Sequence, residues 1–119
     1  MPQHPERRFE RYTIKVPLFI HAMDGSTVRK VIHIESRDVS AGGVSFETSQ
    51  KVPLEAQSRV VLSQLGDLKG DALIRARVAH REKDPKTGRY MVGLEFTEFV
   101  NITREELVAH LESWKEQGP

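Results

Sequence analysis

The sequence predicts an all-β protein, a small antiparallel β-barrel followed by a single C-terminal α-helix. Short segments rich in β-branched and aromatic residues recur along residues 12–96, and clusters of Gly, Pro, Asp and Ser separate them. After residue 100 the apolar residues change to a helical period. The length of 119 residues fits one domain and leaves little room for a second.

Alternation of apolar and polar residues predicts strands over residues 12–20, 27–36, 44–48, 59–65, 72–81 and 89–96. Asp24-Gly25 is a hairpin turn signal between the first two, and residues 84–88 have the composition of a hairpin loop between the last two. Gly93, inside the last segment, predicts a bulge or a close backbone approach. Residues 49–58 and 66–71 are expected to form polar connections.

The C-terminal helix is expected over residues 101–117. Thr103 and Glu106 form a capping box, in which the Thr103 hydroxyl accepts from the Glu106 N–H and the Glu106 side chain reaches back. Apolar residues then recur at helical spacing, at Leu107, Val108, Leu111 and Trp114. This stripe is expected to cover one mouth of the barrel, with Trp114 in the core. In the alternative, the helix presents Leu107 and Trp114 to a partner.

Composition limits the classes of function. The net charge is +1, so no global field draws the chain onto nucleic acid or an acidic membrane, and anion binding must come from local clusters. There is no cysteine, which excludes disulfides and thiolate chemistry. The polar N-terminus does not resemble a signal peptide. No segment approaches the roughly 18 apolar residues of a membrane span. A cytoplasmic protein without membrane insertion is therefore expected.

Residues 1–11 differ from the rest of the chain, because they are polar, carry two prolines and show no apolar period. We expect them to form a flexible N-terminal arm. Three guanidinium groups fall within five positions of this arm, at Arg7, Arg8 and Arg11. In the alternative, these arginines are ordinary solvated residues paired with Glu6 and Glu10, since runs of charge usually face water.

A second polar segment, residues 38–43, is expected to form a tight turn that leads into a strand. Asp38 and Ser40 have short side chains that bond to nearby backbone N–H groups. Gly42 and Gly43 permit backbone angles that a side chain would forbid. Such a turn directs several N–H groups the same way and makes a concavity that accepts anions. A plain connecting turn is the alternative for this segment taken alone.

Together the two segments resemble the two-part signature of PilZ domains. In that family an RxxxR motif is followed, after a variable gap, by [D/N]xSxxG. Arg7 and Arg11 match the first motif, and the second is matched by Asp38, Ser40 and Gly43. Residues 90–96 also resemble the late strand of the family. The resemblance covers the chain from Glu6 to about Phe99 and is specific because both motifs occur in order.

The resemblance implies a bacterial receptor for the second messenger cyclic di-GMP, with a six-stranded antiparallel barrel over residues 12–99. The implied ligand-binding residues are Arg7, Arg8, Arg11, Asp38, Ser40, Gly42 and Gly43. The ligand, in many PilZ domains an intercalated dimer, would bridge the arm and the turn. It would order the arm and so alter a surface seen by a protein effector in signal transduction. No cofactor is implied besides this ligand.

Other classes of function have less support. No paired carboxylates or nucleophile and base stand out, and neither the GxxxxGK[ST] nor the GxSxG pattern occurs, so an enzyme is not expected. A metal site is not expected from scattered histidines. A PilZ-fold interaction module that binds no nucleotide is one alternative. A barrel that binds RNA or single-stranded DNA is another, although the near-neutral charge and few aromatic residues argue against it.

Overall fold

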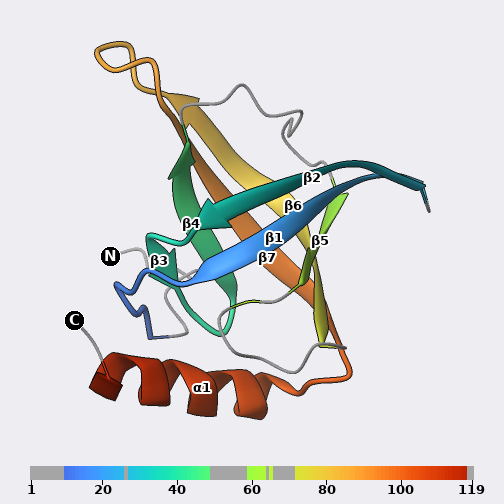
Figure 1. Ribbon diagram of the computed structural model, residues 1–119, viewed down its shortest axis with the longest axis vertical. Helices are drawn as coiled ribbons and strands as arrows, with labels where there is room; N and C mark the ends of the chain where they lie inside the picture. The colour runs from blue at the N-terminus through green and yellow to red at the C-terminus, as the bar shows by residue number, and fades with distance from the viewer. Residues whose placement is uncertain (1–9, 26, 49–58, 64, 66–71, 118–119) are drawn as a thin grey trace, which may run out of the picture.

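The computed structural model describes residues 10–25, 27–48, 59–63, 65 and 72–117. The strands in these ranges are β1 (Pro17–Asp24), β2 (Thr27–Glu35), β3 (Asp38–Val39), β4 (Gly43–Thr48), β5 (Arg59–Ser63), β6 (Leu73–Lys83) and β7 (Tyr90–Val100). One helix, α1 (Arg104–Gln117), follows them. Figure 1 shows a strongly curled sheet with α1 at one end. The predicted fold class, an antiparallel all-β domain with a C-terminal helix, is confirmed.

All paired strands are antiparallel, and the sheet order is β2-β1-β5-β6-β7-β4-β3. The two end strands, β2 and β3, are neighbours in the chain, separated only by Ser36 and Arg37. Tyr12, ahead of β1, exchanges two backbone hydrogen bonds with Val39 of β3, at 2.8 and 2.9 Å. The ladder is thus open, and this bridge joins β3, at one end of it, to the segment ahead of β1. The described residues form an open sheet of seven strands, whereas the resemblance implied a closed barrel of six.

The interruption between β2 and β3 has a physical cause in the buried side chain of Ser36. Its hydroxyl accepts from the Val16 N–H at 3.0 Å and donates to the Ile14 carbonyl at 2.7 Å. The Ser36 N–H still donates to the Val16 carbonyl at 2.9 Å, so the side chain replaces one of the two backbone hydrogen bonds at this point. Pro17 begins β1 just beyond it, a position that proline tolerates because it has no N–H to donate.

Two hairpins form as predicted. Gly25, in the β1–β2 turn, has a φ of 64°, and Gly88, in the β6–β7 loop, has a φ of 75°, which glycine adopts readily. The expected irregularity at Gly93 is also present. The β6–β7 register passes from Val78 opposite Leu94 to His80 opposite Gly93, which leaves one extra residue on β6. A bulge of this kind bends the strand and increases its twist.

The core lies between the inner face of the curled sheet and α1. The largest fully buried side chains come from both, and they include Phe46, Leu18, Ile20, Leu62, Ile74, Leu107 and Leu111. The Glu106 N–H donates to the Thr103 hydroxyl at 3.1 Å and the Thr103 N–H donates to the Glu106 carboxylate at 2.9 Å, so the capping box is confirmed. Trp114 is buried in the same core, as predicted.

The predicted connections at residues 49–58 and 66–71 lie outside the described residues. So does most of the N-terminal arm, including Arg7 and Arg8. The one helix of the described part, α1, has 14 residues, and it is neither long enough nor apolar enough to cross a membrane.

Candidate functional site

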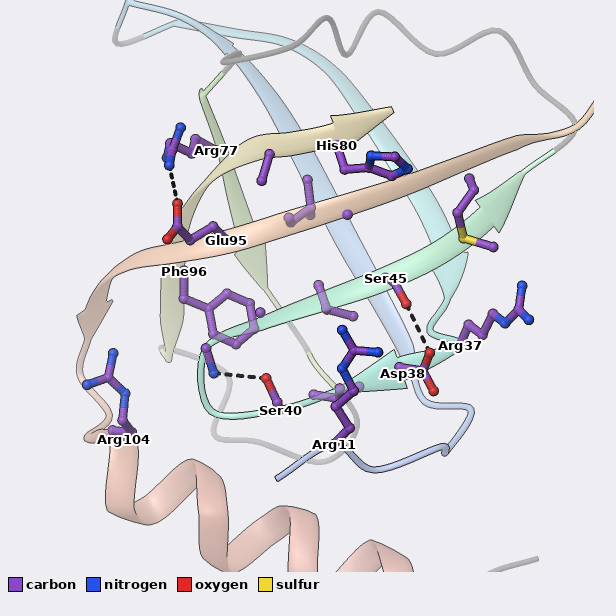
Figure 2. A pocket seen from close by; sticks show the side chains of 18 residues that line it. Arg11, Arg37, Asp38, Ser40, Ser45, Arg77, His80, Glu95, Phe96 and Arg104 are labelled. Atoms are coloured by element: carbon purple, nitrogen blue, oxygen red, sulfur yellow. Dashed lines mark hydrogen bonds and ion pairs between the residues drawn. The ribbon is translucent and has the colours of Figure 1, made fainter. Parts of the chain in front are cut away.

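A cavity of about 1050 Å³ opens beside the turn that joins β3 to β4, and β6, β7 and the start of α1 contribute to its wall (Figure 2). Its lining includes five of the seven residues that the sequence selects, namely Arg11, Asp38, Ser40, Gly42 and Gly43. The fold thus brings the end of the arm and the turn to one place. The other two, Arg7 and Arg8, lie outside the described residues.

Asp38 presents a carboxylate that is held by hydroxyl groups. The Thr13 hydroxyl donates to one carboxylate oxygen at 3.0 Å, and the Ser45 hydroxyl lies 3.5 Å from the other. Ser45 is also the residue opposite Asp38 in the β3–β4 pair. No cation pairs with Asp38 within the described residues. A carboxylate has about four lone-pair positions, so Asp38 keeps acceptor capacity toward the cavity.

The turn is locked by its own hydrogen bonds. The Ser40 N–H donates to the Gly43 carbonyl at 2.9 Å, and the Gly42 N–H donates to the Ser40 hydroxyl oxygen at 3.1 Å. The Gly42 carbonyl accepts from the Phe96 N–H at 2.9 Å. The expected use of these N–H groups as an anion-accepting concavity is therefore wrong for Ser40 and Gly42, because both donate within the turn. The Ser40 hydroxyl still has its own proton to donate.

Gly43 is required for a reason different from the one expected. The positive φ angles among the described glycines belong to Gly25 and Gly88, so the special backbone angles predicted at Gly42 and Gly43 are not found. Instead, a Cβ atom at Gly43 would lie 2.2 Å from the carbonyl oxygen of Leu94 in β7. Gly43 therefore lets β4 approach β7 closely beneath the cavity.

Four arginines line the cavity, which makes its wall positive although the whole chain carries a net charge of only +1. Two of them are engaged. Arg77 forms an ion pair with Glu95, and Arg104 donates to the Ala41 carbonyl at 3.2 Å with its guanidinium 5.1 Å from the Phe99 ring centre. The other two, Arg11 and Arg37, are exposed and have no side-chain partner within the described residues.

Three of these arginines were not selected from the sequence. Arg77 lies on β6 and Arg104 at the start of α1, and only the folded topology brings them to the turn. Arg37 directly precedes Asp38, and this adjacency was the one sequence signal available for it. A second cavity, of about 1170 Å³, shares Arg77 with the first, also has Arg59 and Arg75 in its lining, and contains none of the selected residues.

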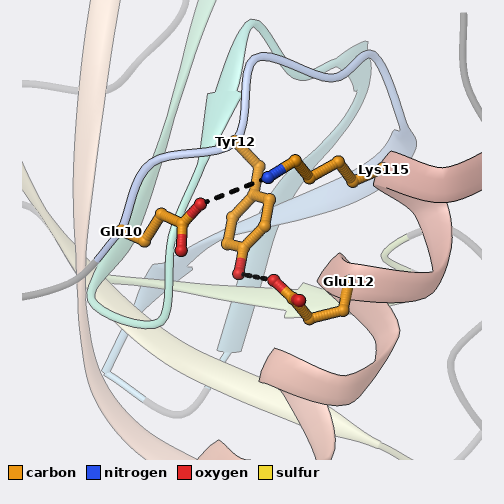
Figure 3. Close-up of polar contacts among 4 residues, drawn as sticks. All are labelled: Glu10, Tyr12, Glu112 and Lys115. Atoms are coloured by element: carbon orange, nitrogen blue, oxygen red, sulfur yellow. Dashed lines mark hydrogen bonds and ion pairs between the residues drawn. The ribbon is translucent and has the colours of Figure 1, made fainter.

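Next to Arg11, a small polar cluster joins the segment ahead of β1 to α1 (Figure 3). The Tyr12 hydroxyl donates a short hydrogen bond to Glu112. The Lys115 ammonium lies 3.5 Å from the Glu10 carboxylate and 5.7 Å from the Tyr12 ring centre. The hydrogen bond to Glu112, together with burial and the negative charges of Glu10 and Glu112, raises the pKa of Tyr12 to about 12. Both sequence neighbours of Arg11 are thus anchored to the helix.

Comparison with known proteins identifies the family of this arrangement. The PilZ domain model matches residues 5–113, which is most of the chain. None of the curated proteins matches this chain. Within the described residues, no group of His, Asp and Glu side chains has the arrangement of a metal site.

Solved structures share the fold at low sequence identity. The motility inhibitor MotI/DgrA of Bacillus subtilis is 17% identical over 98% of this chain and 57% of its own, with a TM-score of 0.71. Apo MrkH of K. pneumonia is 14% identical over 98% of this chain and 53% of its own, with a TM-score of 0.64. The PilZ domain of Escherichia coli YcgR with c-di-GMP is 15% identical over 94% of this chain and 93% of its own, with a TM-score of 0.58. The chain thus spans a little over half of the first two proteins.

Proposed function

Because the chain belongs to the PilZ domain family, we propose that it is a receptor for cyclic di-GMP. The observation that carries this proposal is that Arg11 and the turn residues Asp38 and Ser40 line one cavity, although they come from distant parts of the sequence. The YcgR domain and MrkH, which share the fold, both have structures with c-di-GMP. A binding function of this kind needs no catalytic group.

The chemistry of the cavity suits this ligand. Cyclic di-GMP carries two phosphates and two guanines. The Arg11 guanidinium can pair in a bidentate manner with phosphate oxygens or with guanine O6 and N7. The Asp38 carboxylate only accepts hydrogen bonds, so its natural partners are the guanine N1–H and N2–H₂ groups. The Ser40 hydroxyl keeps a proton for a phosphate or a base edge.

In this proposal the ligand acts as a bridge. It binds the arm, residues 1–11, through Arg7, Arg8 and Arg11, and it binds the turn through Asp38, Ser40, Gly42 and Gly43. Arg8 would stack on a base or contact the second molecule of an intercalated ligand dimer. Bridging orders the arm against the PilZ domain, residues 12–99, with α1 (Arg104–Gln117) beside it. Ordering of a segment by a small ligand is a known form of switch.

The output would be a contact with a cytoplasmic effector rather than a chemical reaction. The relatives differ in the outputs that their names state, since MotI/DgrA is an inhibitor of motility and MrkH is a c-di-GMP-dependent transcription regulatory factor. The fold therefore serves more than one kind of output. We propose a protein effector for this chain.

Calorimetric titration of the purified protein with cyclic di-GMP tests the proposal, with GTP and cyclic di-AMP as controls. We expect selective binding of cyclic di-GMP, at one ligand per chain or at two if an intercalated dimer enters. GTP lacks the cyclic pair of phosphates, and cyclic di-AMP lacks the guanine edge that Asp38 would read. If titration with cyclic di-GMP gives no heat of binding, the receptor function is ruled out, and an interaction module of PilZ fold is the remaining proposal.

A further inference from the structure

We propose that Arg37 is a further ligand-binding residue of this site, one that acts beside Arg11. The inference rests on the proposed function, because it concerns the same cavity and the same ligand. Arg37 lines the cavity and lies outside both motifs of the PilZ signature. The chemistry it would recognise is a pair of adjacent acceptors, either two phosphate oxygens or guanine O6 and N7.

The Arg37 side chain is available to a ligand. A ligand that recruits Arg77 must compete with Glu95, and one that recruits Arg104 must compete with the Ala41 carbonyl and the Phe99 ring. Within the described residues, Arg37 has no such internal partner to give up. Contact with the ligand therefore costs Arg37 only its hydration and its side-chain freedom. Of the other three arginines that line the cavity, Arg11 alone likewise has no side-chain partner within the described residues.

The orientation of the Arg37 side chain relative to Asp38 also favours this role. In an uninterrupted strand, neighbouring side chains point to opposite faces, so Arg37 and Asp38 would diverge. The chain bends at Arg37, where the interruption between β2 and β3 falls. The burial of the side chains agrees with this bend. Arg37 is exposed and Asp38 is half-buried, whereas Ser36 and Val39 on either side of them are buried. Both polar side chains therefore project to the outer side of the sheet.

The backbone of Arg37 is held in place by β4. The Arg37 N–H donates to the Ser45 carbonyl at 2.7 Å, and Ser45 in turn contacts the Asp38 carboxylate. The backbone that carries Arg37 is thus tied to β4. Figure 2 shows Arg37 and Asp38 on one side of the cavity, with the Arg77–Glu95 pair and Arg104 on the other. A guanine held by Asp38 would therefore lie beside Arg37.

The test compares cyclic di-GMP binding by the wild-type chain, Arg37→Ala, Arg37→Lys and a control, Arg89→Ala. Arg89 is a surface arginine outside the cavity that pairs with Glu47 at 3.2 Å, so its removal lowers the net charge equally. We expect Arg37→Ala to weaken binding roughly 10- to 150-fold, the range for loss of a hydrogen bond to a charged group. Lysine keeps the charge but not the planar guanidinium, so the affinity of Arg37→Lys should lie between those of the wild-type chain and Arg37→Ala.

Each outcome has a distinct meaning. If the wild-type chain binds and Arg37→Ala binds equally well, the role of Arg37 is overturned while the proposed function stands. An equal loss in Arg89→Ala would also overturn it, because net charge alone would then explain the effect. If the wild-type chain does not bind, both proposals fail. A 7-deazaguanine analogue of cyclic di-GMP tests whether Arg37 binds guanine or phosphate. Its bases lack N7, so the loss of affinity in Arg37→Ala shrinks with this analogue only if Arg37 binds N7.

Discussion

Ser40 and Gly43 serve the turn itself, whereas Arg11 and Asp38 present their side chains to the cavity. The Ser40 hydroxyl caps the Gly42 N–H, and Gly43 makes room for the carbonyl of Leu94. Arg11 and Asp38 make no ion pair within the described residues. Substitution of Gly43 should therefore act mainly on stability, substitution of Arg11 or Asp38 mainly on ligand affinity, and substitution of Ser40 on both.

Gly43→Ala should destabilise the fold. The new Cβ would lie 2.2 Å from a backbone oxygen of β7, so two paired strands must separate. We expect the free energy of unfolding in urea to fall by about 1–3 kcal/mol or more, the usual cost of overpacking. Gly93→Ala is the matched control, since its Cβ would meet only the His80 Cβ at 3.5 Å, an ordinary contact. Equal stability of the two variants would contradict this assignment of Gly43.

Arg11→Ala should leave stability unchanged and weaken cyclic di-GMP binding. Arg11 is exposed and has no partner to lose within the described residues. The loss of one charge-assisted anchor should cost about 1.5–3 kcal/mol of binding free energy, or roughly 10- to 150-fold in affinity by calorimetry. Lys15→Ala removes a charge from the same exposed segment outside the cavity and serves as the control. Unchanged affinity in Arg11→Ala would remove this residue from the site.

At the scale of the elements, Tyr12 joins three parts of the fold. Its backbone pairs with Val39 of β3, its hydroxyl donates to Glu112 of α1, and its ring lies under Lys115. Arg11 is its direct neighbour and lines the cavity. We expect a ligand that displaces the backbone at Arg11 to disturb the contact between this segment and α1, so α1 is well placed to report binding.

The Tyr12 cluster predicts a dependence of stability on pH. The folded state raises the pKa of Tyr12 from 10.0 to about 12, so it favours the neutral phenol. This contribution is fully present below pH 10 and is lost as the pH rises from 10 through 12. Urea unfolding across this range should show a steeper loss of stability for the wild-type chain than for Tyr12→Phe, which has no phenol to ionise.

Tyr90→Phe provides the control for this experiment, because it removes the other tyrosine of the chain and leaves the Glu112 contact intact. It should lose stability with pH as steeply as the wild-type chain does. Parallel curves for the wild-type chain and Tyr12→Phe would show that the Tyr12 hydroxyl does not hold the helix in the way described.

At the scale of the whole molecule, the sequence predicted strands and the helix correctly where apolar residues recur at a regular spacing. Alternation located the long hairpins, and the capping box located the start of α1. The break between β2 and β3 was missed, because the Ser36 hydroxyl forms it through contacts with residues ahead of β1. No alternation of apolar and polar residues records such a contact.

The site was predictable to the extent that it lies in two short motifs. Arg11, Asp38 and Ser40 were selected and do line one cavity, although their contact with a ligand stays a prediction. Arg77 and Arg104 reach the same cavity only because β6 and α1 pass beside the turn. The positive wall of the cavity is thus a property of the folded molecule, which the near-neutral net charge conceals.

In the proposed function, cyclic di-GMP binds in the cavity between the arm and the turn. Two-dimensional ¹H–¹⁵N NMR spectra during titration with the ligand test it most directly, because they report binding and its place together. We predict that the largest amide shifts fall on Arg11 and its neighbours, on residues 37–45 and on residues 93–96. Spectra that stay unchanged, or that change only around Arg59 and Arg75 of the second cavity, would contradict the account.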